Sequence, residues 1–274
     1  MKNVKEMSNI ERLYLELLDR RIVSFSDIAN TVNRLSDRHL SSSHIYDRYI
    51  DKMLKRGLIK RIRRGLYEVT SSSDIKTNVD KFLVASKIKS NYFLGFHTAL
   101  EFYGCAYSSY REAYICVRSK DRFDKFSFSQ ISFRPIFVEN INDWVEEHIY
   151  RNQKIKVSSK ERTFVDCLSR ISYAGGWEEC LKSLQNLSGL NFDKIVNITV
   201  AQGSQILIRR VGYVLELLKS HSIFFNHLPE KILRNLESKI MGQSQYLIRR
   251  RNSLLNARWR IYVPLGFEDY LRGI

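Results

Sequence analysis

The chain has 274 residues, which is more than a single DNA-binding module of the usual size needs and is enough for two domains. Hydrophobic residues make up 44% of the chain, which excludes a disordered protein, and no stretch approaches the ~18 consecutive apolar residues of a membrane span. The formal charge of +16 is typical of proteins that bind a polyanion, because neutralised phosphates release counterions.

The N-terminus and the cysteines indicate a cytoplasmic protein. Residues 1–6 lack the apolar region of a signal peptide. The four cysteines form no CxxC pair and have no His at zinc-finger spacing, so we expect buried, reduced thiols and neither a metal nor another cofactor. We expect no membrane partner, although the charge alone would also suit a membrane surface or an acidic protein.

The first two predicted helices are short and amphipathic. Apolar residues at i, i+3, i+4, i+7 and i+8 from Ile10 predict a helix that ends near Leu18. Ser24, followed three residues later by Asp27, is a cap-like start for a second helix, which buries Phe25 and other apolar residues.

A third helix follows the serines at positions 41–43, any of which could cap it. Its apolar residues, from Ile45 to Leu54, lie within one broad arc. The opposite face carries polar residues at i, i+4, i+7 and i+11, namely His44, Arg48, Asp51 and Lys55. The helix therefore has one face for a core and one mainly basic face for an external partner.

A basic hairpin comes next. Gly57 ends the third helix, and residues 58–69 read as two strands around a tight turn that contains Gly65. Between Lys55 and Arg64 there are six Lys or Arg and no acid. Three short helices followed by a hairpin are the order of a winged helix-turn-helix.

This motif places its third helix in the major groove of DNA and its hairpin along the backbone or in the minor groove. Arginines of the hairpin are candidates for phosphate contacts, and the start of the third helix is a candidate for base contacts. The predicted DNA-binding residues are Ser43, His44, Arg48, Lys55, Lys60, Arg61, Arg63 and Arg64. A solvated basic face or a protein-docking winged helix would give the same pattern, and Asp47 and Asp51 weaken the case because a carboxylate accepts only from cytosine N4 in the groove.

The polar segment Thr70 to Asp74 is the predicted domain boundary, so we expect a winged helix over residues 1–73 and an α+β domain over 74–274 with a helical C-terminal half. Ser158 and Glu161 have the spacing of a capping box. The predicted strands are 92–95, 113–117, 131–138, 154–157, 246–248 and 259–263, and the predicted helices are 79–86, 96–103, one after Ser158, 177–187, 192–200, 205–220 and 229–241.

Several stretches of the chain resemble the AbiEi family, and they occur in the same order as in that family. AbiEi proteins are the antitoxin and transcriptional-regulator half of AbiE-type toxin–antitoxin systems. Residues 57–67 resemble the family's wing, which ends in Gly-x-Tyr, and residues 96–104 resemble its short "sAl..hG" helix. Residues 157–168 resemble its "Ser-x-x-Glu-Arg-Thr-x-x-Asp" helix start, and residues 209–216 resemble its "RxGYxLE" helix. The resemblance covers most of residues 5–220.

The resemblance implies an autorepressor whose N-terminal domain binds its own promoter and whose C-terminal domain counteracts a nucleotidyltransferase-like toxin. The alternative is a stand-alone winged-helix transcription factor, or a docking module, without a toxin. One winged helix reads only a half-site, so we expect homodimers or cooperative binding to inverted repeats of double-stranded DNA.

The second domain offers a further candidate surface for an antitoxin contact or another partner. Arg162 and Asp166 are four residues apart on one helix and can pair or jointly face a partner, but an ordinary surface or interface ion pair fits equally. Gly212 in mid-helix suggests that another backbone approaches closely. The candidate partner residues are Arg162, Asp166, Arg209, Arg210, Tyr213, Glu216, Arg249, Arg250 and Arg251. For the candidates on the predicted helix 205–220, the alternative is that their side chains pack within the domain and contact no partner.

From Arg209 to Arg260 there are eleven Lys or Arg and three acids, so this region could contact DNA, RNA or an acidic protein.

Neither a GxxxxGK phosphate loop nor a GxGxxG, HExxH or GxSxG motif occurs, and Gly203-Ser204 is not followed by the Asp-x-Asp of nucleotidyltransferases. We therefore expect that the protein is not an enzyme; a nucleotide-handling activity in the second domain is the alternative.

Overall fold

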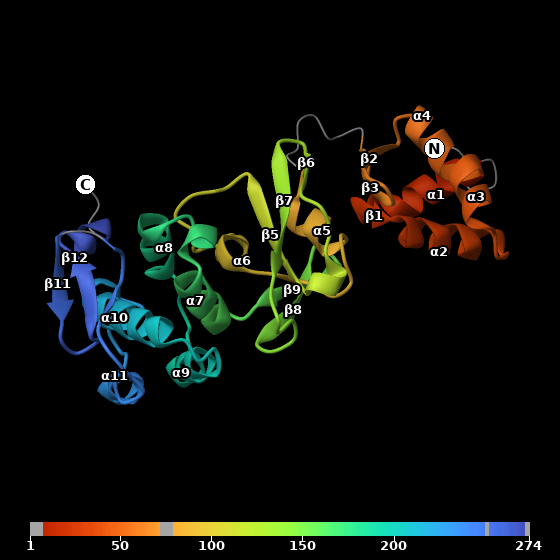
Figure 1. The fold of residues 1–274 in the computed structure, drawn as a ribbon. Coiled ribbons are helices and arrows are strands. Elements are labelled where there is room, and N and C mark those ends of the chain that lie inside the picture. Colours follow the sequence, from red (N-terminus) through yellow and green to blue (C-terminus); the bar gives the residue numbers. More distant parts are fainter. Residues whose placement is uncertain (1–7, 72–78, 250–251, 272–274) are drawn as a thin grey trace. The chain divides into compact units, whose positions relative to one another are not determined.

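The computed structural model describes residues 8–71, 79–249 and 252–271, and these form two compact units. The first unit contains the described residues up to Asn91 together with 126–131 and 148–155, and the second unit contains the others. The predicted boundary at residues 73 and 74 lies outside the described residues. The predicted fold class is confirmed: a winged helix precedes a mixed α and β region, and the C-terminal half is mainly helical (Figure 1).

The three helices and the hairpin of the winged helix follow the predicted order, and a short strand that the sequence did not predict lies between the first two helices. The elements are α1 (Asn9–Leu18), β1 (Ile22–Ser24), α2 (Phe25–Ser36), α3 (Ser42–Ile45), a π-helical turn (Tyr46–Ile50), α4 (Asp51–Lys55), β2 (Ile59–Arg63) and β3 (Leu66–Val69). The three strands pair antiparallel in the order β1-β3-β2. The predicted third helix is thus continuous from α3 through the π-helical turn to α4. The π-helical turn in its middle is not evident from the periodicity of apolar residues.

Local capping explains where these helices begin. Ser24 and Asp27 form the predicted capping box at the start of α2, and Ser8 with Glu11 forms a second one at α1. Ser41 caps α3 by accepting from the backbone N–H of His44. The apolar faces of α1, α2 and the third helix then close one core over β3. Their outward faces, the basic one included, stay in solvent.

The second part of the chain is built on a six-stranded sheet of order β6-β7-β5-β4-β9-β8. Two short helices lie on either side of its first strand in the sequence: α5 (Lys81–Ser86) precedes that strand and α6 (Phe96–Phe102) follows it. The strands are β4 (Phe93–Leu94), β5 (Glu112–Val117), β6 (Phe126–Phe128), β7 (Ile131–Phe137), β8 (Val145–Tyr150) and β9 (Gln153–Ser158). β5 pairs parallel with β7 and antiparallel with β4, so the sheet is mixed.

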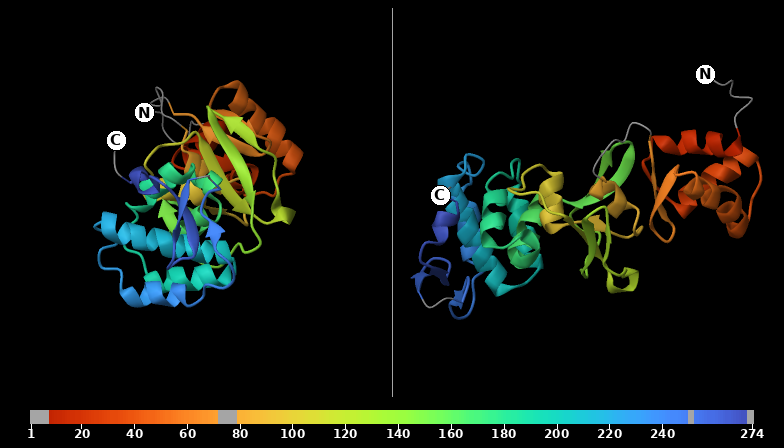
Figure 2. Two further views of the ribbon diagram at one scale, coloured as in Figure 1. Left: turned by 60° about the vertical axis from the view of Figure 1, so that its left-hand side comes forward. Right: turned by 90° about the horizontal axis from the view of Figure 1, so that it is seen from above.

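The C-terminal half consists of helices and a small sheet. The helices are α7 (Lys160–Ser169), α8 (Trp177–Leu184), α9 (Phe192–Ala201), α10 (Gln205–His221) and α11 (Glu230–Glu237). The strands β10 (Gln245–Tyr246), β11 (Ser253–Asn256) and β12 (Ile261–Pro264) form a sheet of order β10-β12-β11, which lies beside α10 (Figures 1 and 2). One large apolar core joins these elements to α6 and β5.

One predicted cap is wrong. The side chain of Ser159, not Ser158, caps α7 by accepting from the N–H of Arg162 at 3.2 Å. The hydroxyl of Ser158 lies 2.7 Å from that of Thr163, and Glu161 instead accepts from the N–H of Asn191 and pairs with Lys194. Because the hydroxyl of Ser158 is engaged by Thr163 and by the carbonyl of Leu94, the next serine along the chain takes the capping position.

The four cysteines are buried and unpaired, as expected, and burial raises the pKa of Cys105 to about 12. No helix in the described residues is both long enough and apolar enough to cross a membrane.

Candidate nucleic-acid interface

The basic face of the third helix is exposed to solvent. Ser43 and His44 in α3 and Arg48 in the π-helical turn are all exposed, while Ile45 and Ile50 from the same segments are buried in the core. The structure therefore places these three candidate residues together on the outer face of one helix. A helix with a free polar face of this kind can enter a major groove.

Two carboxylates share this face, and one of them has a partner. The Nζ of Lys55 lies 2.6 Å from a carboxylate oxygen of Asp51, one turn away, and this contact raises the pKa of the lysine. The side chain of Asp47 is exposed. Lys55 therefore partly neutralises the charge of Asp51. The same contact makes Lys55 less available to bind a phosphate.

Most cations of the hairpin are exposed to solvent. Ile59 and Ile62 of β2 are buried, whereas Lys60 and Arg61 are exposed, and Arg64 lies in the exposed turn next to Gly65. The register between β2 and β3 shifts between Arg61 and Arg63, which is a β-bulge. Gly65 takes the left-handed conformation that the tight turn requires, with φ of +76°.

Two of the arginines are held by aromatic rings. The guanidinium of Arg61 donates to the hydroxyl of Tyr46 in the third helix and lies 5.8 Å from the centre of that ring. Tyr46 was not among the residues singled out by sequence, because only the fold brings it to the wing. Arg63 is half-buried and lies 5.0 Å from the ring centre of Phe126 in the same unit. Arg61 thus links the wing to the helix, and Arg63 is less accessible than the other hairpin cations.

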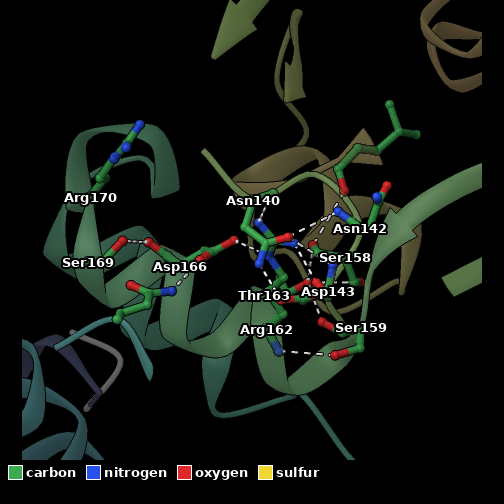
Figure 3. A network of polar contacts seen from close by, with 12 residues as sticks. Asn140, Asn142, Asp143, Ser158, Ser159, Arg162, Thr163, Asp166, Ser169 and Arg170 are labelled. Carbon is green, nitrogen blue, oxygen red and sulfur yellow. Dashed lines mark hydrogen bonds and ion pairs between the residues drawn. The ribbon is translucent and has the colours of Figure 1, made fainter. Parts of the chain in front are cut away.

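The Arg162–Asp166 pair of the second unit is a buried network (Figure 3). Arg162 donates from Nε to Asp166 at 3.2 Å and from its two terminal nitrogens to the carbonyls of Asn140 and Asp143, at 2.8 and 2.5 Å. Its guanidinium also lies 4.2 Å from the ring centre of Phe93. The side chains of this pair are only 8% exposed, so the alternative of an ordinary surface ion pair is wrong.

Burial sets the electrostatics of that network. Desolvation raises the pKa of Asp166, and Arg162 and a hydrogen bond from Gln202 at 2.9 Å offset part of the effect. The helix start that the sequence matched to a family motif therefore anchors the segment of residues 140–143 to α7. In the described parts of the chain, no group of three His, Cys, Asp or Glu side chains could hold a metal ion.

The comparisons with known proteins agree with the geometry of the first unit. Residues 12–70 match the family described as "Transcriptional regulator, AbiEi antitoxin". The expected AbiEi resemblance is confirmed. The match supports a DNA-binding regulator of antitoxin type, and it spans the third helix and the wing.

Among solved structures, the crystal structure of the RV2827C protein from Mycobacterium tuberculosis is similar, with a TM-score of 0.66 at 12% sequence identity. The alignment covers 96% of this chain and 94% of that one, so the similarity of fold extends far beyond the AbiEi match. At this identity the likeness concerns the fold alone. A search of curated proteins found no significant match.

The AbiEi-like "RxGYxLE" stretch lies in α10, and most of it is turned inward. Arg209 has no exposed surface and donates to the backbone carbonyls of Gln205, Met241 and Gln243, so it holds the segment before β10. Tyr213 is also buried. The prediction that these two residues form a partner surface is therefore not supported, because their side chains pack inside the unit.

Glu216 binds within the unit as well. It accepts from the indole of Trp259 and from Arg258, each at 2.6 Å, and Arg258 also binds Glu230 and Glu237 of α11. The half-buried Arg210 and the exposed Arg249 remain accessible among the candidate partner residues, whereas Arg250 and Arg251 lie outside the described residues.

Proposed function

We propose that the protein is a DNA-binding autorepressor of an AbiE-like toxin–antitoxin system. The observation that carries this proposal is the joint exposure of Arg48 on the third helix and of Lys60, Arg61 and Arg64 on the wing, inside the segment that matches the AbiEi family. Cations at these two places of a winged helix face the groove and the flanking phosphates.

The proposed target is double-stranded DNA upstream of the protein's own gene. A single winged helix covers one half-site, so the protein would bind inverted repeats as a homodimer or cooperatively. A promoter–reporter fusion tests this role. Co-expression of the wild-type chain should reduce reporter output, and scrambling one repeat should relieve it. Equal output with and without the protein would argue for the docking-module alternative.

The proposed second role is to counteract a nucleotidyltransferase-like toxin through the C-terminal unit. This role rests on the family match, which ends at residue 70, and on the basic surplus of the C-terminal region. The test is co-expression with a neighbouring gene of that type: growth arrest by the toxin alone should be relieved by the full chain. If no such gene is present and binding sites are scattered across the genome, the protein is a stand-alone transcription factor.

A further inference from the structure

The second unit contains an open cleft of about 1300 Å³ that the proposed function does not use. Its lining comes from the segments that follow β5 and β7, from the face of α7 that carries Arg162 and Asp166, from the end of α9 and from the first turns of α10. All of these residues belong to the second unit. Figure 3 shows the wall that carries Arg162 and Asp166. Pockets for small ligands usually measure ~300–1000 Å³, so a ligand of nucleotide size fits.

Four cations line this cleft and form no salt bridge among the described residues: Arg118, Lys120, Arg170 and Arg210. Arg170 is still near enough to Asp166 to lower the pKa of that carboxyl slightly. Arg170 and Arg210 each donate to one backbone carbonyl, of Phe137 and of Leu168, both at 3.1 Å. The Nε atoms of Arg118 and Arg210 are buried and have no hydrogen-bond partner within the described residues. Burial also lowers the pKa of Arg210, so an anion that binds there would recover part of the desolvation cost.

The lining of the cleft contains five cations and three carboxylates, so positive charge is in excess. Asp166 is bound by Arg162 and Gln202, Asp143 accepts from a neighbouring side-chain amide, and Glu139 is exposed to solvent. Arg162 uses three of its five N–H donors on protein groups and its side chain is only 8% exposed, so it mainly supports the wall. The more accessible donors belong to the other four cations.

Aromatic side chains lie beside these cations. Phe137 is 47% exposed, and Trp144 is half-buried at the same cleft. Trp144 has a φ of +54°, which a bulky residue rarely adopts, and its carbonyl accepts from the N–H of Ser159 at 2.7 Å. Backbone strain of this kind concentrates at functional sites, where the surrounding structure maintains it.

We infer that this cleft binds a phosphate-bearing nucleotide, with the phosphates on Arg118, Lys120, Arg170 and Arg210 and the base on Phe137 or Trp144. Guanidinium groups beside aromatic faces are how proteins hold single-stranded nucleic acid and nucleotides, because each base offers a π-face and each phosphate a charge. An acidic peptide would use the cations and leave the exposed ring of Phe137 without a role. The ligand could be a free nucleotide or the end of a single strand, which share this chemistry.

The experiment uses the full chain with Arg61→Ala and Arg64→Ala, so that binding at the wing does not mask the cleft. ATP and a short oligouridine are titrated while tryptophan fluorescence is recorded, and Trp144→Phe in this background identifies the ring that responds. Lys120→Ala/Arg170→Ala removes two exposed cations of the cleft. Lys231→Ala/Arg234→Ala on α11, which also removes two exposed cations but none from the cleft, is the matched control.

We expect saturable quenching that the Trp144→Phe variant loses, and an affinity that falls by about tenfold or more in the cleft variant and by less than about twofold in the control. Similar affinities for ATP and oligouridine would identify a free nucleotide, and much tighter binding of oligouridine would identify a strand. Absence of saturable binding, or equal losses in both variants, would overturn the inference. An acidic peptide that competes with either probe at equal affinity would overturn it too. None of these results depends on repression by the winged helix.

Discussion

Trp259 packs its indole directly over Gly212, so closely that a β-carbon on residue 212 would lie 2.0 Å from Cζ3 of the ring. The same indole donates to Glu216 one turn further along α10. The sequence suggested that another backbone approaches Gly212, but the approaching group is a side chain. This contact joins the C-terminal sheet to α10, since only Arg260 separates Trp259 from the start of β12.

Gly212→Ala should destabilise the second unit. The added methyl must displace a fully buried ring, which costs roughly 1–3 kcal/mol and outweighs the gain of ~1 kcal/mol in helix propensity. Thermal unfolding should show a Tm lower by several degrees. In a Trp259→Leu background the same substitution should be neutral or stabilising. An equal decrease of Tm in both backgrounds would show that the ring does not cause the cost.

Arg162→Ala should be strongly destabilising, because it leaves Asp166 buried without its cation and two carbonyls without their donor. Breaking a buried pair in this way costs about 3–5 kcal/mol. The double variant Arg162→Met/Asp166→Leu removes both charges and should cost less than Arg162→Ala alone. Urea unfolding of the three proteins measures the difference. A destabilisation below about 1 kcal/mol for Arg162→Ala would mean that the pair behaves like a surface ion pair.

Glu161 should make stability depend on acidity. Burial alone would raise the pKa of this carboxyl, but hydrogen bonds from the N–H of Asn191 and from Lys194 outweigh burial and lower it below its ordinary value of 4.5. The carboxyl of Glu161 therefore binds a proton more readily in the unfolded chain than in the folded one. Its contribution to the free energy of unfolding is present above pH 4.5 and is lost as the pH falls through the lowered pKa of the folded state. Glu161→Gln should lower the Tm at neutral pH and flatten its decline in acid. Parallel acid profiles for the variant and the wild type would contradict this.

Arg48→Ala and Lys60→Ala should separate base contacts from phosphate contacts. Removing a base contact of Arg48 should cost about 1–3 kcal/mol on the operator and little on scrambled DNA. Removing a phosphate contact of Lys60 should weaken binding to both duplexes and reduce the salt slope by about one. Arg34→Ala is the control, because this exposed cation of α2 pairs with Glu16. If Arg48→Ala weakened both duplexes equally, Arg48 would be a phosphate contact.

The fold of the first unit followed from sequence because its signals are local. The capping box at Ser24, the apolar arc of the third helix and the glycines at 57 and 65 lie within a few residues of the structures they specify. The strands β6 and β8 were missed for a local reason as well. Their two-residue turns use Ser129-Gln130 and Arg151-Asn152, all with positive φ, where Asn-Gly or Asp-Gly would have signalled a hairpin.

In the second unit, the burial of key arginines depends on contacts with residues distant in the sequence, which local sequence patterns do not reveal. Arg162 is buried because the carbonyls of Asn140 and Asp143, some twenty residues away, complete its hydrogen bonds. Arg209 likewise binds carbonyls more than thirty residues later. Charge and helical spacing made both arginines resemble surface residues. Only the tertiary fold reveals that they are internal and that the cations of the cleft, at residues such as Arg118 and Arg170, are the more accessible ones.

The most direct test of the central claim is a binding titration with the DNA upstream of the protein's own gene. It compares the wild type with an Arg61→Ala/Arg63→Ala/Arg64→Ala variant at two salt concentrations. We predict tight, sequence-selective binding by the wild type, and weaker binding with a smaller salt slope in the variant, reduced by about 0.9 for each phosphate that the variant no longer neutralises. Weak, unselective binding that the variant leaves unchanged would contradict the repressor proposal and would direct attention to the basic surfaces of the second unit.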